Sequence, residues 1–415
     1  MKFIYYILRY LQTIMSNTKP SIPKGMRDFT SEVMFRRNYI FETVKSAFKR
    51  YGYTPIQTPA MENIGTLTGK YGDEGDRLIF KVLNSGDYLS KAILDDNTTS
   101  KSLTKQISEK ALRYDLTVPF ARFAVQNRND ITFPFKRYQM QNVWRADRPQ
   151  EGRYREFYQC DADVIGTDSL LCEVELVQLY DDVFSQLKIP NIDICINNRK
   201  LLSGMVELMD ATNLFSDVVI ALDKLSNIGL KKVKEEMQNK GVKSDSLSIL
   251  DTFLNTKNVA DLSSLLAQSE VGKKGLEELQ FVIDNITKLG LQSVNLVFDI
   301  TLARGLDYYT GCILEVKAND VQIGAIGGGG RYDDLTSNFG LKDISGVGIS
   351  FGIDRIYLVM EELSLFPENI GVSTKVMFAN FGGREANYCL PLLKELRANG
   401  ISSELYPKAA KMKKQ

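Results

Sequence analysis

The stretch PFKRYQMQNVWRADRPQEGRYREFYQCDADVIG, residues 134–166, decides the fold that we expect of this chain. Its two outer parts, residues 134–146 and 155–166, contain the aromatic and β-branched side chains that strands favour. The polar segment RPQEGR between them contains a proline and a glycine, which is typical of a turn. These features predict two antiparallel strands joined as a hairpin.

The same strand pattern recurs on both sides of a long helical region. Residues 31–53 carry apolar side chains at helical spacing,. Residues 201–292 are helical in pattern, rich in Lys, Ser and Asp and poor in aromatics, so they read as an inserted module. Hairpin-linked strands with helices beside them predict an α+β fold with an antiparallel sheet. The other strand-like segments are 54–61, 77–82, 296–318, 324–335 and 346–352.

The composition excludes whole classes of chemistry, because the 415 residues contain no histidine. A Ser-His-Asp or Cys-His nucleophile, a His-ligated zinc or haem, and an imidazole base are all ruled out. Catalysis would have to use carboxylates, arginines, lysines, hydroxyls, backbone dipoles or a cofactor. The 52 basic and 51 acidic residues nearly balance, so binding to nucleic acid would require a local basic patch.

The cysteines and the first residues bear on location. Five scattered cysteines without CxxC spacing predict reduced thiols in a cytoplasmic protein, with no disulfide or metal framework,. Residues 1–14 are apolar, but Arg9 interrupts a run that is already too short to cross a membrane. We therefore expect no membrane association, and we interpret these residues as an extension upstream of a working start at Met15.

Residues 375–415 predict one βαβ unit. The strand-like segment 375–381 is followed by a helical pattern that ends at Gly400 and by a second strand-like segment at 401–407,. Two parallel strands with one helix bury too little apolar surface to be stable alone. We therefore expect the chain to end within a domain.

Three arginine-containing segments, VWRADRPQEGRYREF, LARGLDYYTG and GVGISFGIDRIY, are flanked by strand-like sequence. Arginines that converge on one sheet can hold a triphosphate without a P-loop lysine, although each alone could be a surface ion pair. The glycines of GAIGGGGRYDD permit a close approach of backbone to a ligand or a helix, or form a flexible loop. In LRYDLTVPF, Asp115 and Thr117 are expected on one side of a strand, where they could bind an ammonium group if buried.

Together these segments resemble the motifs of class II aminoacyl-tRNA synthetases, and specifically the histidyl-tRNA synthetase family. PKGMRDF with its following helix and Pro59 is similar to motif 1, residues 133–166 to motif 2, and GVGISFGIDRIY to motif 3. LARGLDYYTG and GGGGRYDDL resemble the two signatures peculiar to the histidine enzymes. The resemblance extends from about Pro23 to Gln415.

The resemblance implies a reaction that needs no histidine in the enzyme. The carboxylate of the substrate L-histidine attacks the α-phosphate of ATP, so the protein supplies positioning and charge stabilisation. ATP would bind with Mg²⁺, and no protein-ligated metal is expected. By this similarity the catalytic residues are Arg145 and Arg304, and the ATP-binding residues are Arg145, Arg153, Arg304 and Arg355.

The resemblance also implies an amino-acid pocket and a tRNA(His) surface. Asp115, Thr117 and Gln159 would accept hydrogen bonds from the α-ammonium, and Asp163 and Tyr309 would bind the imidazole. Arg148 and Gln150 would contact the acceptor end of the tRNA. The implied histidine-binding residues are Asp115, Leu116, Thr117, Arg145, Gln159, Asp163, Arg304, Tyr308 and Tyr309.

The implied organisation is a homodimer, since motif 1 builds the dimer interface in this class. The expected parts are an N-terminal extension (1–22), a catalytic domain in two pieces (23–200 and 293–365), the helical insertion (201–292) and an incomplete anticodon-binding domain (374–415).

The sequence departs from the family at Tyr158, where histidine is usual. Because this substitution coincides with the absence of histidine elsewhere, we hypothesise a histidine-depleted variant. Two other interpretations remain open: a histidine-sensing regulatory paralogue of ATP phosphoribosyltransferase, and an inactive fragment retained for interaction.

Overall fold

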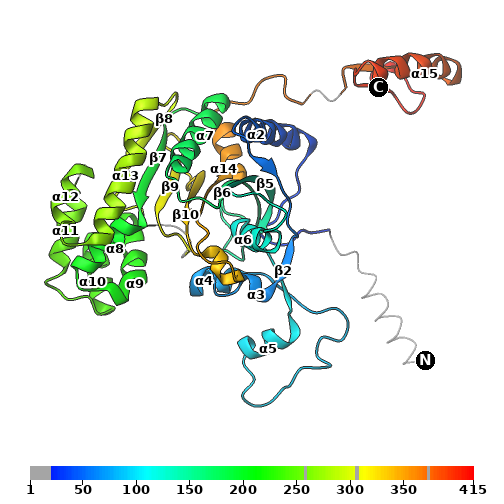
Figure 1. The fold of residues 1–415 in the computed structure, drawn as a ribbon. Helices are drawn as coiled ribbons and strands as arrows, with labels where there is room; N and C mark the ends of the chain where they lie inside the picture. The colour runs from blue at the N-terminus through cyan, green and yellow to red at the C-terminus, as the bar shows by residue number, and fades with distance from the viewer. Residues whose placement is uncertain (1–19, 257–258, 304–307, 372–373) are drawn as a thin grey trace.

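The computed structural model describes residues 20–256, 259–303, 308–371 and 374–415. At its centre is one eight-stranded sheet in which antiparallel pairs predominate and helices flank the strands (Figure 1). Only the outermost pairs, β1–β5 and β7–β8, are parallel. The α+β fold is therefore as expected. In spatial order the strands are β1 (Thr54–Pro55), β5 (Phe135–Trp144), β6 (Glu156–Ile165), β11 (Gly346–Gly352), β10 (Gly327–Tyr332), β9 (Cys312–Ala318), β7 (Ile192–Asn198) and β8 (Val294–Phe298).

The hairpin predicted from residues 134–166 is the longest pairing of this sheet. β5 and β6 pair antiparallel from Phe135 opposite Ile165 to Trp144 opposite Glu156. β11 continues the ladder on the other side of β6. Because side chains alternate between the two faces of a strand, every second residue of β5 and β6 shares one face. The polar cross-strand pairs on one face are Arg137–Asp163, Gln139–Asp161 and Gln141–Gln159.

Three helices bury the apolar core against the sheet: α2 (Ser31–Arg50), α7 (Leu171–Leu187) and α14 (Ile353–Glu362). α2 begins where the hydroxyl of Thr30 accepts a hydrogen bond from the Val33 amide, as N-cap residues do. Its buried residues, Ile40, Val44, Ala47 and Phe48, follow the helical period,. Phe48 packs edge-on against Phe351 of β11, so the core joins the helices to the strand beside β6.

A small three-stranded sheet and short helices lie next to the main sheet. The segment 77–82 was expected to be a strand, but only Lys81–Val82 is one, because Arg77 and Leu78 complete the preceding helix. The elements are β2 (Met61–Asn63), β3 (Lys81–Val82), β4 (Lys110–Leu112), α3 (Ile64–Leu67), α4 (Gly72–Leu78), α5 (Ser100–Ile107), α6 (Thr117–Gln126) and η3 (Leu335–Phe339).

The residues between β7 and β8 are helical, as their composition predicted, and they gather on one side of the sheet (Figure 1). α13 lies against α8 and also contacts α7, which joins this group to the core. The helices are α8 (Arg199–Leu208), η1 (Thr212–Leu214), α9 (Phe215–Asp223), α10 (Leu225–Asn239), α11 (Leu247–Asn255), η2 (Val259–Asp261), α12 (Leu262–Leu265) and α13 (Glu270–Leu289).

The last described segment forms the predicted βαβ unit, which Figure 1 shows away from the main sheet. β12 (Val376–Phe378) and β13 (Ser403–Leu405) pair in parallel. α15 (Gly383–Ala398) connects them. A short helix, η4 (Met412–Lys414), follows.

Candidate active site

A cavity of about 220 Å³ lies where β6, β10 and β11 meet the segment before α6. We call it the inner cavity. It brings together most of the residues expected to bind an amino acid, from elements far apart in the sequence. Those residues are Asp115, Thr117, Arg145, Gln159, Asp163, Tyr308 and Tyr309. Leu116 is not among the lining residues, because its side chain is buried in the core.

The expectation of a strand through Asp115 and Thr117 is wrong. β4 ends at Leu112, and α6 begins at Thr117. The carboxylate of Asp115 accepts a hydrogen bond from the Val118 amide at 3.2 Å, which satisfies a helix N-terminal amide, and Pro119 lies in the first turn, where proline is tolerated. Asp115 and Thr117 nevertheless both reach the inner cavity.

Asp115 is held by two tyrosines. The hydroxyl of Tyr71 donates to one carboxylate oxygen at 2.8 Å, and that of Tyr308 donates to the other at 3.0 Å. Asp115 is 1% exposed, and its burial raises its pKa while these hydrogen bonds oppose the rise. The sequence offered no signal for Tyr71, since its distance from Asp115 along the chain hides the contact.

Asp163 forms a buried ion pair that the sequence analysis did not identify. Its carboxylate lies 2.7 Å from a guanidinium nitrogen of Arg137 and accepts a hydrogen bond from the Tyr332 hydroxyl at 2.8 Å. On the neighbouring strand, a Cβ at Gly348 would overlap this carboxylate. Burial raises the pKa of Asp163, and the charge of Arg137 opposes the rise. The hairpin register places position 137 opposite 163, so counting pairs from the turn could have found Arg137.

The four consecutive glycines form part of strand β10 and not a flexible loop. A Cβ at Gly330 would come within 2.9 Å of the Tyr309 ring, and one at Gly327 within 2.9 Å of the Tyr180 ring. The glycines therefore let two tyrosines pack directly on the strand backbone. Tyr309 is held at the inner cavity in this way.

A second cavity of about 510 Å³, the outer cavity, adjoins the first. Arg145 and Phe157 line both cavities, so the two are continuous at Arg145. The outer cavity contains the arginines expected at a triphosphate except Arg304, which lies outside the described residues. Its lining residues are Tyr114, Arg145, Asp147, Gly152, Arg153, Tyr154, Phe157, Tyr158, Asp223, Asn227, Ala325, Gly352, Asp354 and Arg355.

Backbone carbonyls hold two of these arginines in place. Arg145 donates through Nε to the Tyr114 carbonyl at 3.1 Å, and its guanidinium lies 4.2 Å from the Tyr114 ring centre. Arg355 donates to the carbonyls of Gly152 and Ala325 at 2.8 and 2.6 Å. A neutral carbonyl anchors a guanidinium without cancelling its charge, so both remain cations that can meet an anionic ligand.

The loop between β5 and β6 carries the other predicted residues. Arg153 forms an ion pair with Asp147 at 2.9 Å. Arg148 and Gln150 are exposed and line neither cavity. They are therefore accessible to a large partner at the rim, but not to a small ligand inside.

The segment Pro23–Phe29, which we call the N-terminal strap, fastens this loop. The Gly25 carbonyl accepts a hydrogen bond from the Arg155 amide at 2.8 Å. Gly25 has a φ of +84°, and a Cβ there would meet Pro149 at 2.8 Å. The guanidinium of Arg27 lies 3.3 Å from the Tyr154 ring centre, a cation–π contact.

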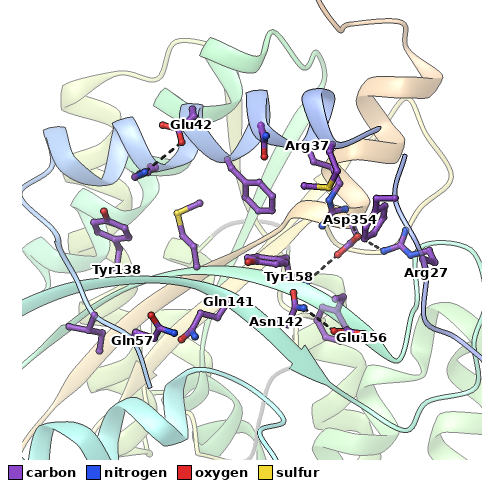
Figure 2. Close-up of a pocket in the computed structure, with 18 residues that line it drawn as sticks. Arg27, Arg37, Glu42, Gln57, Tyr138, Gln141, Asn142, Glu156, Tyr158 and Asp354 are labelled. Atoms are coloured by element: carbon purple, nitrogen blue, oxygen red, sulfur yellow. Dashed lines mark hydrogen bonds and ion pairs between the residues drawn. The ribbon is translucent and has the colours of Figure 1, made fainter. Parts of the chain in front are cut away.

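Arg27 also joins the strap to α14. Figure 2 shows Arg27 and Arg37 converging on Asp354. Arg37 pairs with Asp354 at 2.6 Å, and Arg27 pairs with the same carboxylate oxygen. Asp354 directly precedes Arg355, so the strap connects the β5–β6 loop to the helix that carries an arginine of the outer cavity.

Tyr158 lies outside the inner cavity. Its ring lines the outer cavity and a third cavity of about 620 Å³ between α2 and β5–β6, and it packs on Phe41 with ring centres 4.8 Å apart (Figure 2). The Tyr158 amide donates to Asp354 at 3.0 Å. This fixed contact comes from the backbone and is independent of the side chain at position 158.

Within the described ranges, no group of three or more acidic or cysteine side chains could hold a metal ion. No described helix is both long and apolar enough to cross a membrane.

Comparison with known proteins gives consistent matches. A family model described as histidyl-tRNA synthetase matches residues 25–356. The chain is 57% identical over 405 residues to the histidine–tRNA ligase of Christiangramia forsetii, an alignment that covers 96% of this chain and 89% of that protein.

Solved structures agree in fold. The histidyl-tRNA synthetase of Nostoc sp. PCC 7120 superposes with a TM-score of 0.77 at 28% identity, covering 96% of this chain and 88% of that one. A Bacillus halodurans structure titled as an ATP phosphoribosyltransferase regulatory subunit/histidyl-tRNA synthetase has a TM-score of 0.73 at 21% identity, covering 94% and 93%. This second likeness shows the fold alone.

Proposed function

The chain belongs to the histidyl-tRNA synthetase family, and from this premise we propose that it activates L-histidine with ATP and transfers it to tRNA(His). One observation carries the proposal. A pocket of buried carboxylates and tyrosines opens at Arg145 into a cavity that contains further arginines. An amino acid in the first cavity and a nucleotide in the second would meet at this guanidinium.

The inner cavity suits histidine. Asp115, Thr117 and Gln159 supply oxygen acceptors for the three N–H bonds of an α-ammonium group. Asp163 and Tyr309 would bind the two ring nitrogens, with Tyr308 beside them, and the Leu116 backbone would complete the wall next to Asp115. A pocket of this kind rejects an apolar side chain of the same size, because its buried polar groups would lose their partners.

The outer cavity suits ATP. The histidine carboxylate would attack the α-phosphorus, and the bond from that phosphorus to the bridging oxygen would break, releasing pyrophosphate and leaving histidyl-adenylate. Arg145 would stabilise the charge that develops on the α-phosphate, and Arg304 is proposed to assist there. Arg153 and Arg355 would hold the remaining phosphates. No base is required, because the attacking carboxylate is already ionised.

Bound Mg²⁺ would neutralise phosphate charge. The carboxylates of the outer cavity are Asp147, Asp223 and Asp354, and two of them are paired with arginines. Such a sparse donor set fits an ion that takes most of its ligands from phosphates and water, so the expectation of no protein-built metal cage stands.

Transfer to tRNA would occur at the rim of the outer cavity, where Arg148 and Gln150 are exposed. Residues 374–415 are proposed to belong to the anticodon-binding domain, the helices of 201–292 to the insertion, and 23–200 with 293–365 to the catalytic domain. A cytoplasmic homodimer is proposed from the family resemblance. The regulatory interpretation is not favoured, because the curated relative at 57% identity is a histidine–tRNA ligase.

Charging of tRNA(His) tests the proposal. Purified protein incubated with ATP, Mg²⁺, labelled histidine and tRNA(His) should give acid-precipitable label that requires ATP. A tRNA for another amino acid is the control for specificity. Absence of charging on intact tRNA(His) would contradict the transfer half of the proposal.

A further inference from the structure

Gln159 offers an unsatisfied oxygen at the inner cavity. Its side-chain amide donates through Nε2 to the hydroxyl of Ser350 at 3.0 Å. Its Oε1 is buried and has no hydrogen-bond partner among the described residues. A buried acceptor without a partner costs free energy, unless a ligand supplies the missing donor. The amide is therefore arranged to receive a donor from inside the cavity.

The orientation of this amide depends on Ser350, and Ser350 depends on Asp161. Asp161 lies directly opposite Ser350 in the pairing of β6 with β11, and their side chains are hydrogen bonded. An ionised carboxylate can only accept, so the Ser350 hydroxyl donates its single proton to Asp161. The hydroxyl oxygen is then left as an acceptor, and only the NH₂ end of Gln159 can satisfy it.

We propose that Asp161 and Ser350 are positioning residues that hold the Gln159 amide with its oxygen directed at the α-ammonium group of the substrate. This inference rests on the proposed function for the identity of the ligand. Asp161 and Ser350 both line the inner cavity, and neither was among the expected site residues. They act through Gln159, in the sequence Asp161 to Ser350 to Gln159.

The arrangement matters because an amide has two unlike ends. If the Ser350 hydroxyl no longer received the NH₂ group, the amide could turn and present N–H donors to a cation that also carries only donors. Binding would lose a hydrogen bond to a charged group, which in proteins contributes roughly a tenfold to a hundredfold change in affinity. ATP would be affected less, because Asp161 and Ser350 do not line the outer cavity.

Protonation of Asp161 would weaken the arrangement. Burial raises the pKa of the Asp161 carboxyl to about 7, with Arg137 opposing and Asp163 adding to the rise. A protonated carboxyl could donate to Ser350 and release the serine proton toward Gln159. Histidine affinity should therefore improve as pH rises through 7. The ionisable groups whose charges act on or respond to Asp161 are Arg137, Asp163, Asp115, Arg113, Cys160, Tyr180 and Tyr309.

Calorimetric titration with histidine tests the proposal. Ser350→Ala should raise the Kd for histidine roughly tenfold or more, whereas the same substitution in a Gln159→Ala background should add little, because there is no amide left to orient. Tyr180→Phe is the matched control. Its hydroxyl donates to the Ser350 carbonyl at 3.0 Å, so its loss perturbs the same strand without touching the Ser350 side chain. Melting temperatures show that each variant folds.

Asp161→Asn tests the titration. Histidine itself titrates in this pH range, so the informative quantity is the ratio of the variant Kd to the unmodified Kd at each pH. That ratio should rise between pH 6 and pH 8. A flat ratio, or equal effects of Ser350→Ala with and without Gln159, would overturn the inference.

The same proteins separate this inference from the proposed function. Pyrophosphate exchange reports the proposed function, and the Kd cycle reports the positioning. Exchange that is present with an unchanged Kd in Ser350→Ala overturns only the positioning. A raised Kd without exchange in the unmodified chain overturns only the function. No binding of histidine to the unmodified chain overturns both.

Discussion

The inner and outer cavities adjoin at Arg145, but they are built differently. Carboxylates of the inner cavity are almost inaccessible and already bonded to protein groups: Asp115 to Tyr71 and Tyr308, and Asp163 to Arg137 and Tyr332. Arginines of the outer cavity are anchored mainly by backbone carbonyls, and the Arg153 side chain is 50% exposed.

This difference teaches where each substitution should register. In the inner cavity, binding groups also stabilise the fold, because each removal leaves a buried partner unsatisfied. In the outer cavity, the cations can be removed with little structural loss, so the cost should appear in the reaction rate. The predictions below separate the two kinds of loss.

Removal of Arg145 should have the largest effect on activity. Arg145→Ala deletes a positive charge proposed to stabilise the α-phosphate in the transition state, which typically costs about 10²–10³ in rate. The melting temperature should change little, because the anchor lost is one hydrogen bond to a carbonyl. Exchange kinetics and thermal melting on the same sample measure both. A large loss of stability would place Arg145 with the inner cavity instead.

Removal of the Asp163 charge should register first in stability. Asp163→Asn leaves Arg137 buried without its counter-ion, at a cost of about 3 kcal/mol in the free energy of unfolding. Urea titration measures this. Glu270→Gln is the control, because the Glu270–Lys273 pair is exposed and such pairs contribute about 0–1 kcal/mol. Equal costs in the two variants would contradict the account of the inner cavity.

The strap should influence the outer cavity from a distance. Arg27→Ala removes both the contact with Tyr154 and the pairing with Asp354, so the loop and α14 would be held less firmly. We expect the KM for ATP to rise several-fold while the Kd for histidine stays within about twofold, since the loss is of positioning and not of a reacting group. Arg36→Ala, at an exposed pair of the same helix, is the control. A change confined to histidine binding would show that the strap serves the inner cavity.

The pH dependence of stability should carry the sign set by the inner cavity. The pKa of Asp161 is raised from 3.8 to about 7 on folding. The folded state therefore holds the proton through a range where the unfolded state has lost it, and stability falls as pH rises from about 4 to 7. Asp161→Asn removes this dependence. The melting temperature of the variant relative to the unmodified chain should therefore rise from pH 5 to pH 8, and a constant difference would contradict the raised pKa.

Restoring histidine at position 158 should have the smallest effect. The Tyr158 side chain does not line the inner cavity, and the contact with Asp354 comes from its backbone. Tyr158→His should therefore change exchange rates by no more than about twofold, because a polar aromatic ring is retained. A tenfold gain would show that the departure from the family pattern matters. The hypothesis of a histidine-depleted variant stays a prediction, which a genomic sequence would test.

The parts of the site that are local in sequence could be predicted. The β5–β6 hairpin, α2 and the βαβ unit follow from periodicity and turn residues, and the motifs pointed to most of the inner cavity. Asp115 was misassigned to a strand because the alternation in LRYDLTVPF was given more weight than the capping ability of an Asp before a proline-containing helix. Tyr71 and Tyr332 reach the carboxylates from distant segments, so no local pattern reports them. Asp161 was overlooked although it shares a strand face with Gln159 and Asp163, and that alternation was readable.

Histidine-dependent exchange of labelled pyrophosphate into ATP tests the central claim most directly, because it requires both cavities to act together at Arg145 and does not involve tRNA. We expect exchange that depends on histidine, saturates with it, and is reduced about 10²–10³-fold in Arg145→Ala. Histidine binding without exchange would contradict the account and favour a histidine-sensing protein.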